Sequence, residues 1–502
     1  MIRMVKKKTE EEKTAHAHAP HEEKKAKARK KPLPSPPEEK HEHEKKETHE
    51  KKEHAEAKHA HEKKEPHTKK EEHHKKETTK EHFLEKEKIF QSEINIGMIG
   101  HVDHGKTSLT KALTGKWCDT HSEEMKRGIS IRLGYADVVF YKLKTPQGIY
   151  YNNKPEYNGE PAEIISQRGV SFVDAPGHET LMTTMLSGAA LMKGAVLVIA
   201  ANEPCPQPRT IEHLMALKFA GVENVVVAQN KVDLVTKEEA MESYKAIRTF
   251  LDNYGFNKTP IIPTVANFNV NIDSLIEAIE TNIPTPKYDS AKPLKMFVAR
   301  SFDINKPGTK PKDLKGAIIG GSITQGIVHT GDTVELVPGL KGRTLAKVVS
   351  ISSSNGIIKE ATPGGLIALC TDIDPSVAQN DQLRGQIAAK PGTIPAPVKE
   401  IKLAIHMFER MIEQNIKDQA KSKDFAGRSE SSDSLRKTII KPTEALVLTI
   451  GTNTNVGFVL KTDGKSAVLN LKNETIAEKG EKVAISKNIN GQWRLIAYGE
   501  IL

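Results

Sequence analysis

The glycine-rich segment Gly100–Thr107 constrains the fold more than any other part of the chain, because of what lies on either side of it. The segment reads Gly-His-Val-Asp-His-Gly-Lys-Thr, and the branched apolar run Ile94–Gly100 before it predicts a buried strand. Residues Lys106–Leu113 predict a helix. A strand, a glycine-rich loop and a helix in this order form a phosphate-binding loop, because the glycines let several backbone N–H groups point at one anion beside the helix N-terminus.

Lys106 and Thr107 give this loop the chemistry of a nucleoside triphosphate site. We expect the ammonium group of Lys106 to reach the β- and γ-phosphates and the Thr107 hydroxyl to bind Mg²⁺. An isolated match of this kind can also be an ordinary strand-to-helix turn. Further motifs follow in the order expected of a guanine-nucleotide site, and together they favour the phosphate-binding interpretation.

A second motif, Asp174-Ala-Pro-Gly-His178, comes directly after the apolar run Val170–Val173. A carboxylate at a strand end beside the phosphate loop can hold Mg²⁺ through a water molecule, which is the role expected of Asp174. Gly177 offers an N–H to the γ-phosphate and, without a Cβ atom, can change conformation when that phosphate leaves. By itself His178 would more often be a surface histidine at a helix start, but within this motif we expect it to orient the attacking water.

The third motif, Asn230-Lys231-Val232-Asp233, follows the apolar run Val225–Gln229 and predicts selectivity for guanine. The Asp233 carboxylate can accept hydrogen bonds from N1–H and the exocyclic amine of guanine, whereas adenine has neither donor. A buried group without a partner costs about 1–3 kcal/mol, so a site of this kind can reject the wrong base by roughly 10⁴-fold. The string Asn-Lys-x-Asp is weak alone, but it is strong at a strand end after a phosphate loop.

Between the first two motifs lies the segment Arg127-Gly-Ile-Ser130. A hydroxyl at Ser130 can join the Mg²⁺ shell only while the γ-phosphate is present, which predicts a segment that switches with the nucleotide state. Without the neighbouring motifs, a serine at this position would be interpreted as an ordinary polar loop residue.

Composition separates a charged N-terminal tail from a globular remainder. The chain has 502 residues, a net charge of +10 and three cysteines without a pairing pattern, which suits a reducing compartment, and we expect a cytoplasmic protein. Residues 1–90 consist mainly of Lys, Glu and His and predict a disordered tail. Such a tract can bind metal or, weakly, RNA, but solvated disorder is the favoured interpretation. The N-terminus lacks the apolar core of a signal peptide, and no apolar run reaches the about 20 residues of a membrane span.

The remaining residues predict an α/β P-loop GTPase domain followed by two all-β barrel domains. From 91 to 287, apolar strands alternate with helical patterns, as in a doubly wound sheet whose ligand lies at the carboxyl ends of the strands. Short strands separated by Gly, Pro, Asn and Asp predict barrels at 288–396 and 397–502, with a mobile loop at 414–434. Helices of the first domain are expected at 180–192, 210–220, 237–254 and 272–282.

The phosphate loop and the motif Asp174–His178 resemble those of translational GTPases of the elongation factor Tu class. Longer strings are similar to the gamma-subunit family of archaeal and eukaryotic translation initiation factor 2, and the resemblance covers residues 92–502 without the tail. These strings are His121–Asp137, Ala201–Pro208, Arg300–Gly308 and, closing the chain, Trp493–Gly499.

The resemblance implies a GTPase that carries initiator methionyl-tRNA to the small ribosomal subunit. It would be the central subunit of a heterotrimer with alpha and beta, hydrolysing GTP to GDP and phosphate on start-site selection. Catalysis is assigned to Asp174, Gly177 and His178, behind an apolar gate formed by Val102 and Ile129. The implied Mg²⁺ ligands are Thr107 and Ser130, with Asp103 and Gly128 for a second Mg²⁺. The implied nucleotide contacts are Asp103, His104, Gly105, Lys106, Thr107, Ser108, Asn230, Lys231, Asp233, Val265, Ala266 and Asn267.

The chain departs from this family at three places. Many members carry a four-cysteine zinc knuckle between the switch segment and Asp174, but residues 142–168 contain no cysteine, so we expect no structural zinc. The Ser-Ala pair that backs the guanine ring is Val265-Ala266 here. In the family the contact from this pair to guanine O6 is normally a backbone N–H, so we expect the guanine site to survive the loss of the serine hydroxyl. The segment 411–434 also differs from the family, so the family's contacts with partner subunits are not carried over to these residues.

Two other classes of protein fit parts of the pattern. A histidine-rich N-terminus on a GTPase is typical of a nickel-delivery protein, but that class does not predict two β-barrels. An elongation-type factor for aminoacyl- or selenocysteinyl-tRNA would share the fold and the chemistry, so only the longer strings favour initiation. The affinities for initiator and elongator aminoacyl-tRNA discriminate between these two functions.

Overall fold

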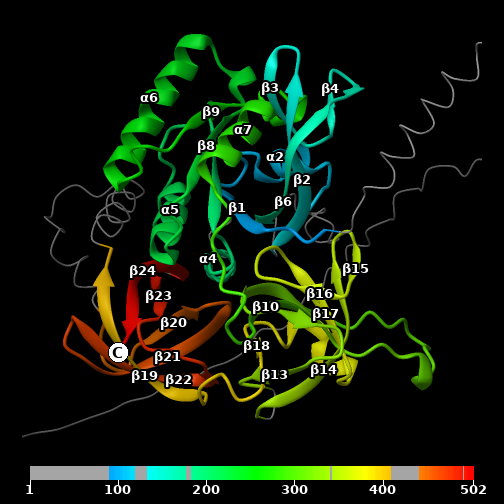
Figure 1. Cartoon of the computed structure of the whole chain (residues 1–502). Helices are drawn as coiled ribbons and strands as arrows, with labels where there is room; N and C mark the ends of the chain where they lie inside the picture. Colours follow the sequence, from blue (N-terminus) through cyan, green and yellow to red (C-terminus); the bar gives the residue numbers. More distant parts are fainter. Residues whose placement is uncertain (1–89, 119–132, 177–181, 340–341, 409–439, 490) are drawn as a thin grey trace, which may run out of the picture. The chain divides into compact units, whose positions relative to one another are not determined.

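The computed structural model describes residues 90–118, 133–176, 182–339, 342–408, 440–489 and 491–502, which Figure 1 shows as the coloured ribbon. They form an α/β domain and two β-barrels, which confirms the predicted fold class. The predicted tail, apart from Phe90, and the loop predicted at 414–434 lie outside the described residues. Across the described ranges, every helix is too short or too polar to span a bilayer.

A seven-stranded sheet forms the centre of the α/β domain, in the order β3-β2-β6-β1-β7-β8-β9. Neighbours from β6 to β9 pair in parallel, and β2 and β3 extend the β6 edge antiparallel. Strands β1 and β7 are buried at every position, as expected where helices cover both faces. The strands are β1 (Ile94–Gly100), β2 (Gly134–Thr145), β3 (Gly148–Asn152), β6 (Glu163–Asp174), β7 (Gly194–Ala200), β8 (Val225–Asn230) and β9 (Ile261–Pro263); the helices are α2 (Lys106–Thr114), α4 (Met182–Ala189), α5 (Pro208–Ala220), α6 (Lys237–Tyr254) and α7 (Ile272–Asn282).

The helices predicted at 237–254 and 272–282 are confirmed as α6 and α7. Local chemistry explains the bounds of α6: Thr236 and Glu239 form a reciprocal capping box at its start, and Gly255 ends it in the left-handed conformation. The helix predicted over 180–192 was wrong at its C-terminal end. Helix α4 ends at Ala189. Beyond it, the N–H of Leu191 donates to Gly188 O and the N–H of Met192 donates to Ala189 O, each three residues earlier.

The antiparallel edge of the sheet was not predicted. Strand β2 pairs with β6 along nearly its whole length and then with β3, and two short strands, β4 (Glu156–Tyr157) and β5 (Glu160–Pro161), follow. Asn153 Nδ2, beside β3, donates to Ala112 O at 3.2 Å and Leu113 O at 2.9 Å. The cysteine-free segment 142–168 therefore contains a hairpin that satisfies carbonyls at the C-terminus of α2.

Each barrel closes six strands around an apolar interior. The first has the order β13-β18-β10-β11-β17-β14, closed by the β13–β14 pair, with β15 added to β14; the second has the order β19-β22-β21-β20-β23-β24. The domain boundaries predicted at 288 and 397 stay predictions. The first barrel and its connections comprise β10 (Lys295–Phe302), β11 (Ile318–Gln325), β12 (Val328–His329), β13 (Thr333–Val337), β14 (Thr344–Ser353), β15 (Gly356–Ile358), β16 (Glu360–Ala361), β17 (Ile367–Thr371), the 3-10 helix η5 (Pro375–Asp381) and β18 (Ile387–Ala389); the second comprises β19 (Val398–Met407), β20 (Ala445–Ile450), β21 (Asn453–Thr462), β22 (Ser466–Thr475), β23 (Lys482–Ile489) and β24 (Gln492–Ile501).

Candidate nucleotide site

The carboxyl ends of the parallel strands bring three of the predicted motifs to one edge of the sheet. The phosphate loop follows β1, Asp174 is the last residue of β6, and Asn230 is the last residue of β8. The loop that contains Ala266 follows β9. Parallel strands expose their carboxyl ends on the same edge, where α/β proteins bind ligands. The predicted roles of Gly128, Ile129, Ser130, Gly177 and His178 concern residues outside the described ranges.

Two glycines determine the path of the phosphate loop. Gly100 has φ 143° and Gly105 has φ 91°, values that residues with a Cβ atom rarely adopt. A Cβ on Gly105 would also collide with the side-chain amide of Asn230. With Gly105 as its N-cap, α2 presents its partial positive end to the loop, as an anion site requires.

Lys106, Thr107 and Asp174 make hydrogen bonds within and beside the phosphate loop. The Lys106 ammonium donates to His101 O at 2.8 Å, which holds it across the loop. Thr107 Oγ1 donates to Asp174 Oδ2 at 2.8 Å, and Asp174 is fully buried. A hydroxyl and a carboxylate are oxygen donors of the kind that Mg²⁺ prefers, so these residues fit a Mg²⁺ site.

Asn230 joins the phosphate loop to the loop after β9 that contains Val265, Ala266 and Asn267, called the base-side loop below. Its Nδ2 donates to His104 O at 3.0 Å, and its Oδ1 accepts the N–H of Ala266 at 3.1 Å. The residue is only 2% exposed, so these two contacts depend on it rather than on water. The sequence predicted Asn230 as a nucleotide contact, and the structure adds this connecting role.

The other residues predicted to contact the nucleotide lie in or beside these two loops. Lys231 takes the left-handed conformation with φ 61°, and Asp233 follows it, exposed, in the short 3-10 helix Val232–Leu234. Val265 and Ala266 are buried, and Asn267 is exposed beside them. Asp103 is exposed in the left-handed conformation, and Ser108 is half-buried in α2.

The imidazole of His104 contacts the protein interior. Its Nδ1 lies 3.0 Å from Val198 O, and its Nε2 lies 3.2 Å from the Glu203 carboxylate. Burial lowers the pKa of His104, which favours the neutral ring. The imidazole is therefore held by the protein interior, and the nucleotide contact predicted for His104 stays a prediction.

His213 in α5 is a site residue that the sequence did not reveal. Its Nδ1 accepts the N–H of Gly100 at 3.1 Å and so holds the first residue of the phosphate loop. Burial lowers the pKa of His213 well below its usual value, and a neutral ring is what this acceptor role needs. A single histidine inside a helical pattern carries no signal of a backbone partner more than a hundred residues away.

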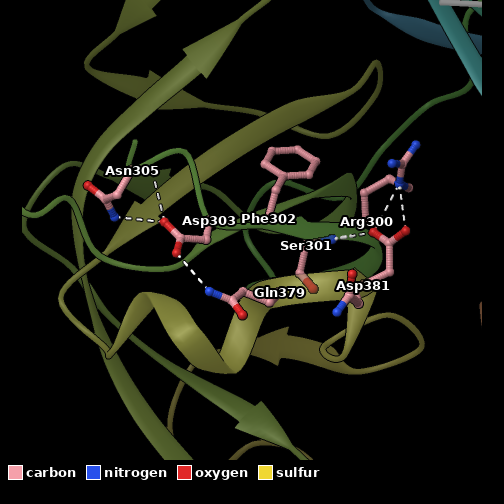
Figure 2. Close-up of a pocket in the computed structure, with 8 residues that line it drawn as sticks. Arg300, Ser301, Phe302, Asp303, Asn305, Gln379 and Asp381 are labelled. Atoms are coloured by element: carbon pink, nitrogen blue, oxygen red, sulfur yellow. Dashed lines mark hydrogen bonds and ion pairs between the residues drawn. The ribbon is translucent and has the colours of Figure 1, made fainter. Parts of the chain in front are cut away.

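The string Arg300–Gly308 is one of those that carried the family resemblance. Its residues Arg300 to Asp303 and Asn305 line a cavity of about 350 Å³ in the first barrel, shown in Figure 2. Arg300 Nε lies 3.0 Å from Asp381 Oδ1, which also accepts the N–H of Ser301 at 3.0 Å. Asp303 accepts hydrogen bonds from Asn305 and Gln379, and these bonds lower the pKa of Asp303. These contacts attach the string to η5.

Comparison with known families finds two matches. Residues 91–285 match the elongation factor Tu GTP binding domain, and residues 399–501 match the C-terminal domain of initiation factor eIF2 gamma. The chain is 47% identical to translation initiation factor 2 subunit gamma of Methanococcus maripaludis strain C6, over 82% of this chain and 99% of the relative. It is 47% identical to the same subunit of Methanocaldococcus jannaschii, over 83% and 99%, and 48% identical to that of Methanothermobacter thermautotrophicus, over 82% and 99%.

Two solved structures show the same fold. The crystal structure of a bacterial selenocysteine-specific elongation factor, EF-Sec, matches with a TM-score of 0.61 and 24% identity, over 82% of this chain and 58% of that one. Elongation factor SelB from Methanococcus maripaludis, in complex with the GTP analogue GppNHp, matches with a TM-score of 0.59 and 21% identity, over 82% and 79%. At these identities the likeness concerns the fold alone.

Within the described ranges, His, Cys, Asp and Glu side chains form no group of three or more that could hold a metal ion. The expectation of no structural zinc stays a prediction.

Proposed function

The chain belongs to the gamma-subunit family of translation initiation factor 2, and from this we propose that it carries initiator methionyl-tRNA to the small ribosomal subunit in its GTP-bound state. Family membership makes the chain a translational GTPase, which binds guanine nucleotide. It also makes the chain one subunit of a multi-subunit initiation factor. The proposed partners are the alpha and beta subunits. The observation that carries the proposal is 47% identity along 99% of a gamma subunit, through both the GTPase domain and the eIF2 gamma-type C-terminal domain.

In the proposed mechanism, the loop Asp103–Ser108 surrounds the phosphates of GTP, with the Lys106 ammonium on the β- and γ-phosphates. Thr107 and Ser130, with Asp174 through a water molecule, would hold Mg²⁺, which would supply positive charge to the phosphate oxygens. Gly177 donates its N–H to the γ-phosphate, and His178 orients the attacking water. The second Mg²⁺ site at Asp103 and Gly128 belongs to the same proposal.

The base is selected on the other side of Asn230. Asp233 accepts the N1–H and amine of guanine, and Lys231 lies beside the ring. Main-chain groups of Val265, Ala266 and Asn267 contact the guanine ring. This contact therefore does not depend on the serine hydroxyl that the chain lacks. Support comes from the position of Asp233 in the turn after β8, where its carboxylate is exposed to an incoming ligand.

Replacing Asp233 with asparagine is expected to shift the preference of the site from guanine to xanthine. The asparagine amide can donate to the extra carbonyl of xanthine, whereas it cannot accept both guanine donors. Two charge-assisted hydrogen bonds are exchanged, so we expect the GDP/XDP affinity ratio to fall by more than about 10²-fold and to drop below one. Competition binding with GDP and XDP measures the ratio. Asp252→Asn, an exposed aspartate in α6, is the matched control. A variant Asp233→Asn that still prefers GDP would contradict the assignment of base reading.

Filter binding of initiator and elongator methionyl-tRNA tests the proposed function. We expect a preference for the initiator that is strong with a GTP analogue and weak with GDP, because the switch segment responds to the γ-phosphate. The assay is run with and without the alpha and beta subunits, which shows how much the partners contribute. Equal binding of both tRNAs, or preference for the elongator, would leave the GTPase assignment in place and move the chain to an elongation-type function.

A further inference from the structure

A cavity of about 780 Å³ lies beside the proposed nucleotide site, between α2, the β2–β3 hairpin with the short strand β4 that follows it, and the start of α7. Ser108, next to the phosphate loop, lines one part of it, and Ala266 and Asn267 of the base-side loop line another. One of these walls thus belongs to the phosphate end of the site and the other to its base end. In a nucleotide the ribose joins base and phosphates, so a ribose bound at the proposed site would lie beside this cavity.

Trp117 presents an aromatic surface to this cavity. The residue lies just after Gly115, which ends α2 in the left-handed conformation and donates its N–H to Lys111 O at 2.7 Å. Lys111 Nζ lies 5.6 Å from the centre of the indole ring, and both side chains line the cavity. A cation over an aromatic face is attractive and orients the ring. Even so, 48% of Trp117 is exposed, which leaves apolar surface for a ligand to cover.

The opposite wall favours an uncharged group. Lys154 and Glu156 form an ion pair at 3.4 Å, so their charges balance. Tyr150 lies edge-on to Tyr157 with ring centres 4.9 Å apart, and burial raises the pKa of Tyr150, which keeps its phenol neutral. Asn153, which also lines the cavity, holds this hairpin to the C-terminus of α2. Aromatic and amide groups with balanced charge suit a sugar or a flat neutral substituent.

We propose that Trp117 is the ribose-side wall of the guanine-nucleotide site, and that the cavity accepts an aromatic group attached to a ribose hydroxyl. The proposal rests on the nucleotide site proposed above. A bound guanine nucleotide then covers the indole ring, and Trp117 contributes to nucleotide affinity. Lys111 acts through the ring as a positioning residue.

Fluorescence of a single tryptophan tests this directly, because the chain has only two tryptophans, Trp117 and Trp493. In the full chain carrying Trp493→Phe, GDP is expected to change the Trp117 emission and to reduce its quenching by acrylamide. Trp117→Ala is expected to weaken GDP binding about tenfold, because it removes the indole surface, roughly half of the side chain, that the bound nucleotide would cover. Trp117→Phe should recover most of this loss. The ribose-modified probe 2′/3′-O-(N-methylanthraniloyl)-GDP should bind within about threefold of GDP, a difference below 1 kcal/mol.

Calorimetric titration of GDP on the same variants separates the possible failures. If Trp493→Phe and the unaltered chain both fail to bind GDP, the proposed nucleotide site is wrong. If GDP binds but Trp117 keeps its emission and quenching, and Trp117→Ala keeps its affinity, the ribose-side wall is overturned while the nucleotide site stands. Ile149→Ala is the matched control, because Ile149 is 60% exposed on the same hairpin and is not a wall residue. Should Trp117→Ala not fold, Trp117→Phe and Lys111→Met together with the quenching data decide.

Discussion

The variant His178→Ala is expected to bind GTP normally and to hydrolyse it about 10²–10⁴-fold more slowly, because that is the usual contribution of a group that positions water or moves its proton. The phosphates and the base are held by other residues, so binding should not change. Single-turnover hydrolysis, measured beside nucleotide affinity, separates the two effects.

His329→Ala is the matched control, since His329 is an exposed histidine in the first barrel. An unchanged single-turnover rate in His178→Ala would show that another group orients the water. A parallel loss of binding and hydrolysis would instead indicate that His178 supports the structure of the site.

The variant Asn230→Ala is expected to lose guanine-nucleotide affinity by about 10²–10³-fold, because it leaves two buried backbone groups without their partner. The carbonyl of His104 and the N–H of Ala266 both bond to this one amide. Without it, the phosphate loop and the base-side loop are no longer held to each other.

Titration with GDP measures this loss, and thermal unfolding without nucleotide reports any general instability. Asn257→Ala provides the control, because Asn257 is exposed and its backbone carbonyl, not its side chain, accepts the hydrogen bond from Arg248. Affinity within about threefold of the unaltered chain would mean that each loop holds its conformation alone.

The sequence predicted the parallel part of the sheet because most residues are apolar in the strand segments that pair there. Strand β7, for example, is buried on both faces and reads as an uninterrupted apolar run. Helix α6 was predicted with its observed bounds because Thr236, Glu239 and Gly255 determine its ends locally. The phosphate loop was recognisable for the same reason, since glycine and lysine act there within a few residues of each other.

The antiparallel edge was less predictable because its pattern is weak. The first five residues of β6 are exposed, so they show neither an apolar run nor a buried alternation. Their pairing with β2 depends on partners that only the fold brings together.

The contacts around the phosphate loop were hidden for a related reason. His213 and Asn230 bond to backbone atoms far away in the chain, and a backbone atom leaves no residue-type signal in the sequence. The sequence thus predicted only part of the role of Asn230 and did not predict the role of His213.

The two bonds of Asn230 also determine how the site responds to pieces of its ligand. Because one side chain holds both loops, we expect a guanosine that orders the base-side loop to order the phosphate loop as well, and pyrophosphate to have the converse effect. Thermodynamic linkage requires this effect to be equal in both directions. We therefore expect base and phosphates to bind as one cooperative unit, so that a nucleotide gains affinity beyond the sum of its fragments.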